Sequence, residues 1–423
     1  MYNNFDIYKD SDQTPNIAYH LIDKHANSHI KDNIALSWIS NDNNKEVYSF
    51  ADLSELSNKF ANMMISMGVE KGDVIVLFIE NLPELYVGFL GGLKTGAIVT
   101  YISNNIDINN IKKRLISLKA KIILTTPRLR NKLNEIIFEL FELQHIVVVN
   151  RSNLDDGLLD IADLDYYHEM DKNSSLFDIN KTFKEDISLI YYTSTENKHL
   201  PVSISHENLL NYYLVSNYVI ENANNEAYFS NVSPEGINFI NFNICYPWIN
   251  ASNNVVFERL DDIGNILTII EKEKVNILCI DESSMMNSGQ TKFYQSYVNK
   301  SNNIRLFKLL LLNFSADLFL NNNNNNYNYI FTDCNLGNVL AFNKSGLDMK
   351  TGYLGLKMIG QELQNSSDTN NKFGELEIDI SKSLIFHSYY REDENCNMDV
   401  NIRNYSLGLK GYVDCKGNIY LQI

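Results

Sequence analysis

Residues 48–98 read YSFADLSELSNKFANMMISMGVEKGDVIVLFIENLPELYVGFLGGLKTGAI, and this stretch contains a complete helix–strand–helix pattern. Apolar residues recur every three or four positions in 50–69, which predicts an amphipathic helix. Residues 73–79 form a short continuous apolar run, typical of a buried strand. Residues 83–99 predict a second helix that ends at glycines. The stretch therefore indicates an α/β fold.

The same alternation continues along most of the chain. A polar linker, roughly 151–184, separates two alternating blocks, and short strands with turns follow from about residue 352. We therefore predict two α/β subdomains with mostly parallel sheets, 1–180 and 181–350, and a small β-rich subdomain, 351–423. The other predicted elements are helices at 109–120, 129–143, 206–220 and 263–274, and strands at 121–126, 145–150, 187–193, 253–258, 275–280 and 304–312.

Composition narrows the classes of partner and compartment. The chain has 423 residues with 52 acidic and 36 basic side chains, a net charge of −16, which argues against nucleic acid or an anionic membrane as partner. The longest apolar runs are too short to span a bilayer, and the polar, acidic start is unlike a secretory signal. Five cysteines without paired spacing indicate free thiols in a reducing cytosol, so we expect a cytoplasmic protein.

The order of segments resembles the large N-terminal part of adenylate-forming (AMP-binding) enzymes, closest to the acetyl-CoA and other acyl-CoA synthetases. The likeness covers about residues 15–423 and implies the large-domain fold of that family. It is carried by NIAYHLIDKHA (16–26), the opening stretch above, AYFSNVSPEGINFINFNICYPWINASNNVVFE (227–258), LDMKTGYLGLKMIGQELQ (347–364), GELEI (374–378) and YSLGLKGYVDCKGNIYLQI (405–423).

The resemblance implies a two-step reaction. A carboxylate attacks the α-phosphate of ATP to give an acyl-adenylate and pyrophosphate, and the CoA thiol then attacks the acyl carbon. Chemistry of this kind depends on positioning and charge stabilisation. The family also continues beyond the last residue here into a small C-terminal lid domain that supplies a lysine for adenylation. We expect that lid to be absent.

The segment YYTSTENKHLPVSISHENL, residues 191–209, lies where the family has its phosphate loop. The family's loop carries glycines, which let backbone N–H groups approach phosphate, and a lysine that neutralises it. Here Thr193 and Ser194 remain, but no glycine occurs again before Gly236, and Glu196 adds a negative charge. Lys198 is the candidate substitute for the family's lysine.

Other nucleotide positions of the family are also replaced. None of the three adenine-contacting residues is kept at 313–315, Asn335 stands where a glutamate helps to hold Mg²⁺, and Leu409 stands where an aspartate binds the ribose hydroxyls. An amide oxygen coordinates Mg²⁺ without neutralising it. We predict no catalytic residue and no metal ligand. The degenerate nucleotide-binding candidates are Thr193, Ser194, Lys198, Asn335 and Gly337.

These replacements favour a catalytically inactive member of the synthetase family that acts by binding a partner, either an active synthetase or an enzyme that modifies one. No cofactor is then expected; ATP and Mg²⁺ would be used only if activity is retained. Two alternatives stay open. One is an acyl- or acetyl-CoA ligase whose lid comes from another chain. The other is a sensor that uses the old cleft for a nucleotide or acyl ligand.

Two further patterns are interpreted as structural. His25 and His29 stand four apart, a spacing that can bind a metal, but no third ligand accompanies them, which favours a solvated helix face. Ser205 precedes His206 in a pair that could suggest nucleophilic chemistry. Its place before a predicted helix favours an N-cap instead.

Two more positions lie near the region that the resemblance assigns to the acyl group and CoA. Gly236 and Asn238 replace larger or hydroxyl residues of the family pattern, and we interpret them as loop residues. Asp281 and Glu282 follow a predicted buried strand where the family has small residues and a proline. Without a partner motif, these two carboxylates are interpreted as a solvated turn.

Overall fold

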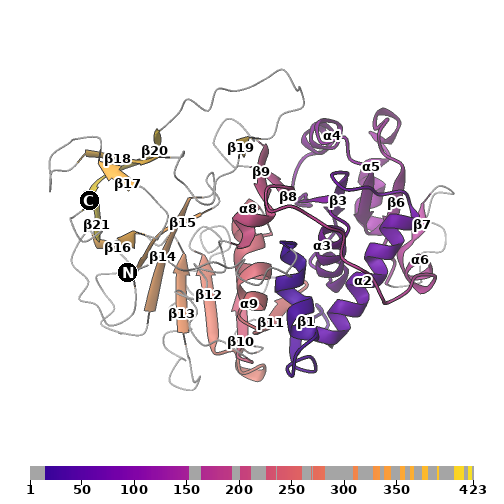
Figure 1. Cartoon of the computed structure of the whole chain (residues 1–423), viewed down its shortest axis with the longest axis horizontal. Coiled ribbons are helices and arrows are strands. Elements are labelled where there is room, and N and C mark those ends of the chain that lie inside the picture. The colour runs from indigo at the N-terminus through magenta and orange to yellow at the C-terminus, as the bar shows by residue number, and fades with distance from the viewer. Residues whose placement is uncertain are drawn as a thin grey trace. The chain divides into compact units, whose positions relative to one another are not determined.

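The computed structural model describes residues 15–151, 163–192, 201–210, 225–234, 236–259, 268 and 270–281, and beyond them only the strands given below. Contacts divide the chain into two compact units that interleave along the sequence. Unit 1 takes in Met1–Asp32, Ser49–Tyr191 and Ser203–Leu210, and unit 2 takes in Asn33–Tyr48, Tyr192–Val202 and Asn211–Ile423 (Figure 1).

Unit 1 contains a sheet in which its strands lie side by side in the order β9-β8-β4-β3-β5-β6-β7. All pairs from β8 to β7 in this order are parallel, as the alternating pattern predicts. The strands are β3 (Val74–Phe78), β4 (Ile98–Tyr101), β5 (Ile122–Thr125), β6 (His145–Val148), β7 (Leu164–Asp165), β8 (Ile187–Tyr192) and β9 (Pro201–Ser205).

The helices of unit 1 pack beside this sheet. The longest, α2, begins with a capping box: Ser49 Oγ accepts a hydrogen bond from the N–H of Asp52 (3.1 Å), and Asp52 Oδ2 accepts one from the N–H of Ser49 (2.8 Å). The helices are η1 (Tyr19–Asp23), α1 (Lys24–Ala26), α2 (Phe50–Ser66), α3 (Pro83–Lys94), α4 (Ile108–Ser117), α5 (Pro127–Leu133), η2 (Ile137–Glu139) and α6 (Tyr166–Asp171).

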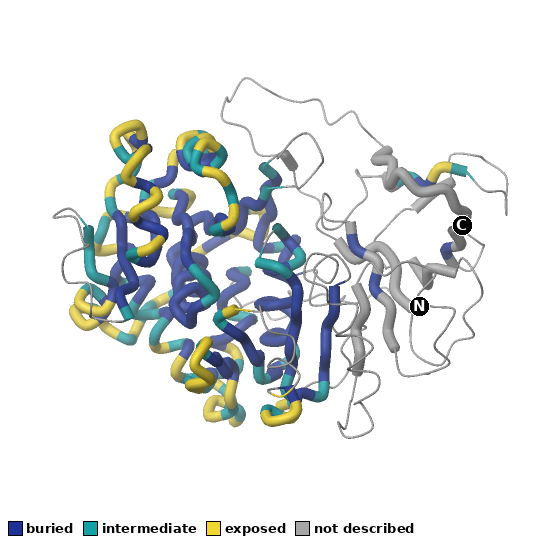
Figure 2. The backbone as a smooth tube through the Cα atoms, turned by 180° about the vertical axis from the view of Figure 1, so that it is seen from behind, coloured by how far each residue is buried: buried dark blue, intermediate teal, exposed yellow. Residues whose placement is uncertain are grey.

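Helix α3 is buried along its whole length, as the dark blue backbone of Figure 2 illustrates for the core of unit 1. Glycine ends the helix as predicted, because Gly96 follows the C-cap residue Thr95 with a φ of 78°. Gly91 instead lies inside the helix. A Cβ added at Gly91 would lie 2.7 Å from the carbonyl oxygen of Ser57 and 2.8 Å from Cδ1 of Phe60, both on α2. Gly91 therefore permits the close approach of α2 to α3.

Two elements of unit 1 differ from the prediction. The expected helix 129–143 is broken: α5 ends at Leu133, and Leu140 reaches the core through the short turn η2. The expected linker 151–184 contains β7 and α6, so it extends the sheet. A buried ion pair holds it in place, because Arg130 Nε donates to both carboxylate oxygens of Asp163 at 2.9 Å.

Unit 2 contains a 13-stranded sheet in the order β17-β18-β20-β21-β16-β15-β14-β13-β12-β10-β11-β1-β2. The pairs from β14 to β1 are parallel and those from β14 to β17 are antiparallel. The first seven strands in chain order are β1 (Ile34–Ile39), β2 (Lys45–Ser49), β10 (Ala227–Ser230), β11 (Asn253–Phe257), β12 (Ile277–Asp281), β13 (Lys308–Leu312) and β14 (Tyr327–Asp333).

The strands predicted for the tail belong to the same sheet. They are β15 (Asn338–Asn343), β16 (Tyr353–Lys357), β17 (Leu363–Asn365), β18 (Gly374–Asp379), β20 (Asn404–Val413) and β21 (Asn418–Leu421), while β19 (Ser388–Tyr389) pairs outside it. The α/β class with mostly parallel sheets is confirmed. The three sequence ranges proposed as subdomains stay a prediction.

The helices of unit 2 whose bounds are described connect β10 to β11. They are α8 (Gly236–Ile240), η3 (Asn241–Cys245) and α9 (Tyr246–Ile249). Residues 270–272 before β12 are also helical. Trp248 in α9 is fully buried, and its indole Nε1 donates to the carbonyl of Ala35 in β1 (2.8 Å). Throughout the part of the chain that the structure describes, no helix is both long and apolar enough to cross a bilayer.

A buried ion pair anchors the end of α3 in unit 1. Lys94 Nζ lies 2.7 Å from Oδ1 of Asp23 and 2.8 Å from Oδ1 of Asn58, and its side chain has no exposed area. Burial lowers the pKa of Lys94, and the charge and hydrogen bond of Asp23 oppose that shift. Such a pair is costly to break because one buried charge then stays uncompensated.

Replacing Lys94 with methionine is expected to lower the free energy of unfolding by about 3–5 kcal/mol, because Asp23 loses its buried counter-charge. Urea denaturation followed by circular dichroism measures the change. Lys172→Met is the control, since Lys172 pairs with Glu169 while half exposed and should cost less than about 1 kcal/mol. Equal losses in the two variants would contradict this account.

Candidate functional site

The strand that leads into the predicted phosphate loop is firmly held in unit 1. The hydroxyl of Thr100 in β4 donates to the carbonyl of Ile190 in β8 (2.8 Å), and the hydroxyl of Ser188 donates to the carbonyl of Ile204 in β9 (3.0 Å). Thr100 and Ser188 are both fully buried. The two strands that flank the loop, β8 and β9, are therefore held by buried hydrogen bonds.

The loop itself, residues 193–200, lies outside the described residues. The candidates Thr193, Ser194 and Lys198 are therefore not placed, nor are Asn335 and Gly337 at 334–337. The adenine position 313–315 is likewise outside. Leu409 lies within β20, between its neighbours β18 and β21 in the sheet. The nucleotide-binding residues stay predictions.

Helical residues begin directly after β9, at His206, and Ser205 caps them. Ser205 Oγ accepts a hydrogen bond from the N–H of Asn208 (3.2 Å). In return, Asn208 Oδ1 accepts from the N–H (3.0 Å) and the hydroxyl (2.8 Å) of Ser205. The N-cap prediction is confirmed, and the hydroxyl is engaged with Asn208 rather than with a histidine.

His206 is fully buried and links the first and last sequence segments of unit 1. Its Nδ1 accepts a hydrogen bond from the backbone N–H of Ile17, 189 positions earlier (3.1 Å). The pKa of His206 is lowered to about 4, and burial is the main cause. The charge of Asp186 opposes this shift, whereas the charges of Lys71 and His20 contribute to it. The residue is therefore neutral at physiological pH, with its proton on Nε2 because Nδ1 acts as acceptor.

The shift in the pKa of His206 predicts a pH-dependent stability. An unfolded histidine titrates near pH 6.5, so between about pH 6.5 and pH 4 the unfolded state binds a proton that the folded state excludes. The stabilisation is complete above about pH 6.5 and decreases as the pH falls to 4, by about 3 kcal/mol in total.

Urea unfolding at pH 7.0, 5.5 and 4.5 tests this expectation. The loss of stability between pH 7.0 and 4.5 should be smaller in His206→Gln than in the wild-type chain, because glutamine does not titrate. His168→Gln serves as the control, since His168 is exposed on α6. If the wild-type chain and His206→Gln lose the same stability over this range, the buried neutral histidine is not responsible.

A second cluster of polar groups lies in unit 2, at the carboxyl ends of parallel strands. After β10 the chain forms β11 on one side of β10, and it then returns to form β12 on the other side of β10. This reversal is a topological switch point, where α/β sheets commonly bind ligands. Asn231 follows β10 and Asp281 ends β12, so both residues lie at this point.

Asp281 is not part of a solvated turn, contrary to the sequence interpretation. It is 4% exposed, and its backbone N–H donates to Oδ1 of Asn231 (2.7 Å). The N–H of Asn231 donates in turn to the carbonyl of Cys279 (3.2 Å). The two strand ends are thus joined by hydrogen bonds, and Asp281 is buried beside Asn231. Glu282 lies outside the described residues.

The positions interpreted as loop residues near the acyl region are helical. Gly236 begins α8 with a positive φ of 67°, a conformation that favours glycine. Two residues later, Asn238 Nδ2 donates to the hydroxyl of Thr332 in β14 (3.2 Å). The hydrogen bond attaches α8 to β14 and gives Asn238 a structural role that the sequence did not indicate.

The histidine pair does not form a metal site among the described residues. The ring of His25 packs against that of Phe50, with centroids 4.8 Å apart, and His29 lies beyond the end of α1. Among those residues no group of three or more His, Cys, Asp or Glu side chains could hold a metal ion. Cys245 and Cys279 are buried free thiols, as predicted for them.

Solved structures first define the class of protein. The fold is that of acyl-CoA synthetases: the Brucella canis acyl-CoA synthetase superposes with a TM-score of 0.81 at 19% identity, over 96% of this chain and 74% of its own. An anthranilate CoA ligase in complex with anthranoyl-AMP gives a TM-score of 0.80 at 18% identity, over 97% and 78%. At these identities the likeness concerns the fold.

Sequence comparison then gives the family. The model of the AMP-binding enzyme family matches residues 22–285, and the chain belongs to this family. The acetyl-coenzyme A synthetase of Bacillus subtilis (strain 168) is 31% identical over 57% of this chain and 41% of its own length. That of Pasteurella multocida (strain Pm70) is 25% identical over 63% and 43%. The chain thus spans less than half the length of these relatives.

Proposed function

We propose that this chain is a non-catalytic member of the AMP-binding family that acts as a binding or regulatory partner. The supporting observation is a contrast between two comparisons. The fold of acyl-CoA synthetases is matched over 96% of the chain, whereas the family's sequence model matches only residues 22–285. The predicted adenine, magnesium and ribose positions, 313–315, Asn335 and Leu409, all lie beyond the matched residues.

The replaced side chains supply the energetic argument. A hydrogen bond to a charged group contributes about 1.5–3 kcal/mol. Four or five lost contacts to ATP and Mg²⁺, discounted for non-additivity, amount to roughly 4–8 kcal/mol, and about 1.4 kcal/mol changes a dissociation constant tenfold. A nucleotide site of micromolar affinity would thereby become weaker than millimolar.

The buried carboxyl group of Asp281 supports the same proposal. It lies at the carboxyl end of β12, where the resembled family has small residues and a proline. The buried side chain of Asp281 takes the place of a smaller residue of the resembled family, which reduces the room for a ligand at this strand end.

The first test is a thermal-shift titration with ATP·Mg²⁺, AMP and a non-hydrolysable acyl-adenylate analogue. A ligand at about 100 times its dissociation constant stabilises the folded state by about 2.7 kcal/mol, which raises Tm by several degrees. We expect no shift for this chain at millimolar ligand. The acetyl-coenzyme A synthetase of Bacillus subtilis, treated in the same way, is the positive control.

Two further outcomes separate this proposal from a ligase that uses a lid from another chain. A shift with ATP, together with ATP-dependent release of pyrophosphate from acetate and Mg²⁺, would overturn the non-catalytic assignment. Affinity purification with the tagged chain tests the partner role. Recovery of a specific protein such as an active synthetase, or an enzyme that modifies one, supports it, and recovery of none contradicts it.

A further inference from the structure

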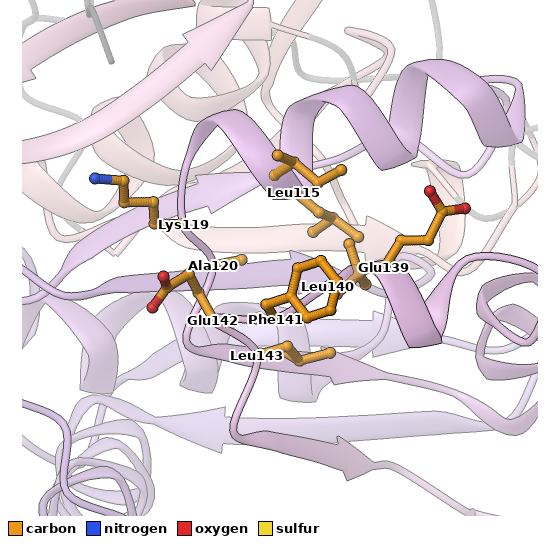
Figure 3. Close-up of a pocket in the computed structure, with 9 residues that line it drawn as sticks. Leu115, Lys119, Ala120, Glu139, Leu140, Phe141, Glu142 and Leu143 are labelled. Carbon is orange, nitrogen blue, oxygen red and sulfur yellow. The ribbon is translucent and has the colours of Figure 1, made fainter. Parts of the chain in front are cut away.

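An apolar pocket opens on unit 1 between α4 and the segment 135–143. It has a volume of about 200 Å³. Leu115, Leu140, Leu143 and Phe141 are among its lining residues, and in Figure 3 the charged ends of Lys119, Glu139 and Glu142 lie around these apolar side chains. The pocket is thus a shallow apolar hollow with a charged rim.

Two large aromatic side chains project from the same segment. Phe138 is 88% exposed and Phe141 is 91% exposed, and Ile116 on α4 is 47% exposed. Single exposed apolar residues are common, but a cluster rimmed by charges typically marks a protein interaction surface. The surface therefore combines a projection, Phe138 and Phe141, with a hollow immediately beside it.

The charges on this surface are divided by sign. Lys112 and Lys113 lie on α4 and Lys119 follows it, whereas Glu135, Glu139 and Glu142 lie on the facing segment. Within one chain the two sides already attract each other, since Lys112 Nζ lies 2.5 Å from Oε2 of Glu139. The whole chain carries a net charge of −16, yet these six side chains sum to zero, and Arg114, the other charged residue of α4, is buried.

We infer that this face, formed by α4, Lys119, Ala120 and the segment 135–143, is where a second copy of the chain docks. A two-fold axis brings the same surface of both copies together, so this surface must be complementary to itself. The lysine side of one copy then faces the glutamate side of the other, and Phe141 of each copy enters the hollow of the other.

Charge decides between a second copy and other partners. Two chains that each carry −16 repel when acidic surfaces meet, and a locally neutral face with divided charges lets them approach without that penalty. A basic partner would instead be expected on a uniformly acidic face. This inference does not depend on whether the chain forms adenylates.

Sedimentation velocity from about 1 to 300 µM tests the inference, a range in which a small interface associates. The wild-type chain should shift from monomer to dimer with rising concentration. Phe141→Ser should weaken dimerisation at least about tenfold, because a buried aromatic anchor is lost. Leu176→Ser is the control: Leu176 is 82% exposed, does not line the pocket, and lies beside Asn62 of α2, so its variant should dimerise normally.

Charge reversal gives a sharper test of the two-fold arrangement. Lys113→Glu and Glu142→Lys, each alone, should weaken dimerisation, because like charges then meet across the interface twice. An equimolar mixture of the two variants should restore it, since each mutated side then faces its complement. A chain that stays monomeric at 300 µM (about the upper limit for a weak dimer), or dimers unaffected by Phe141→Ser, would overturn the inference.

Discussion

Helix α3 is the element on which unit 1 depends, because it is wholly buried and yet carries a charge near each end. Near its N-terminus Glu84 accepts hydrogen bonds from Arg151 (3.0 Å) and from the hydroxyl of Tyr167 (2.7 Å). At its C-terminus Lys94 pairs with Asp23. Both charges are placed favourably for the helix dipole. Because buried charges need partners, these contacts tie the start of the chain and the segment after β6 to one central helix.

Local patterns in the sequence were sufficient for the elements whose partners lie nearby. The helix α2, the strand β3 and the parallel direction of the strands in unit 1 follow from apolar spacing and strand length. The strands β1 and β2 were missed. The partner of β1 is β11, more than 200 positions later, and the exposed residues that flank β1 in the sequence show no periodic pattern. The role of Gly91 has a similar cause: only the approach of Phe60 from α2 shows why glycine is needed inside the helix.

The contacts of the candidate site are likewise either local, and predictable from the sequence, or long-range, and not predictable from it. The cap at Ser205 is local, because Asn208 lies three residues away, and it was predicted correctly. The link from His206 to Ile17 spans 189 positions, and the contact of Asp281 with Asn231 spans 50. Neither distance leaves a trace in a single sequence. Asp281 was therefore assigned to solvent, since a carboxylate after a strand is usually exposed. The pairing of β10 with β12 instead places it beside Asn231 in a buried position.

The use of glycine shows why fold and chemistry can separate in this chain. A Cβ at Gly92 would lie 2.8 Å from Val99, so packing alone forbids a side chain there, as it does at Gly91. The glycines that the resembled family places in its phosphate loop serve the ligand rather than the core, and residues 193–200 contain none. Replacing a packing glycine destabilises the fold at once, whereas replacing a phosphate glycine costs only affinity for a ligand. A superposition over 96% of the chain therefore measures the first kind of constraint and carries no information about the second.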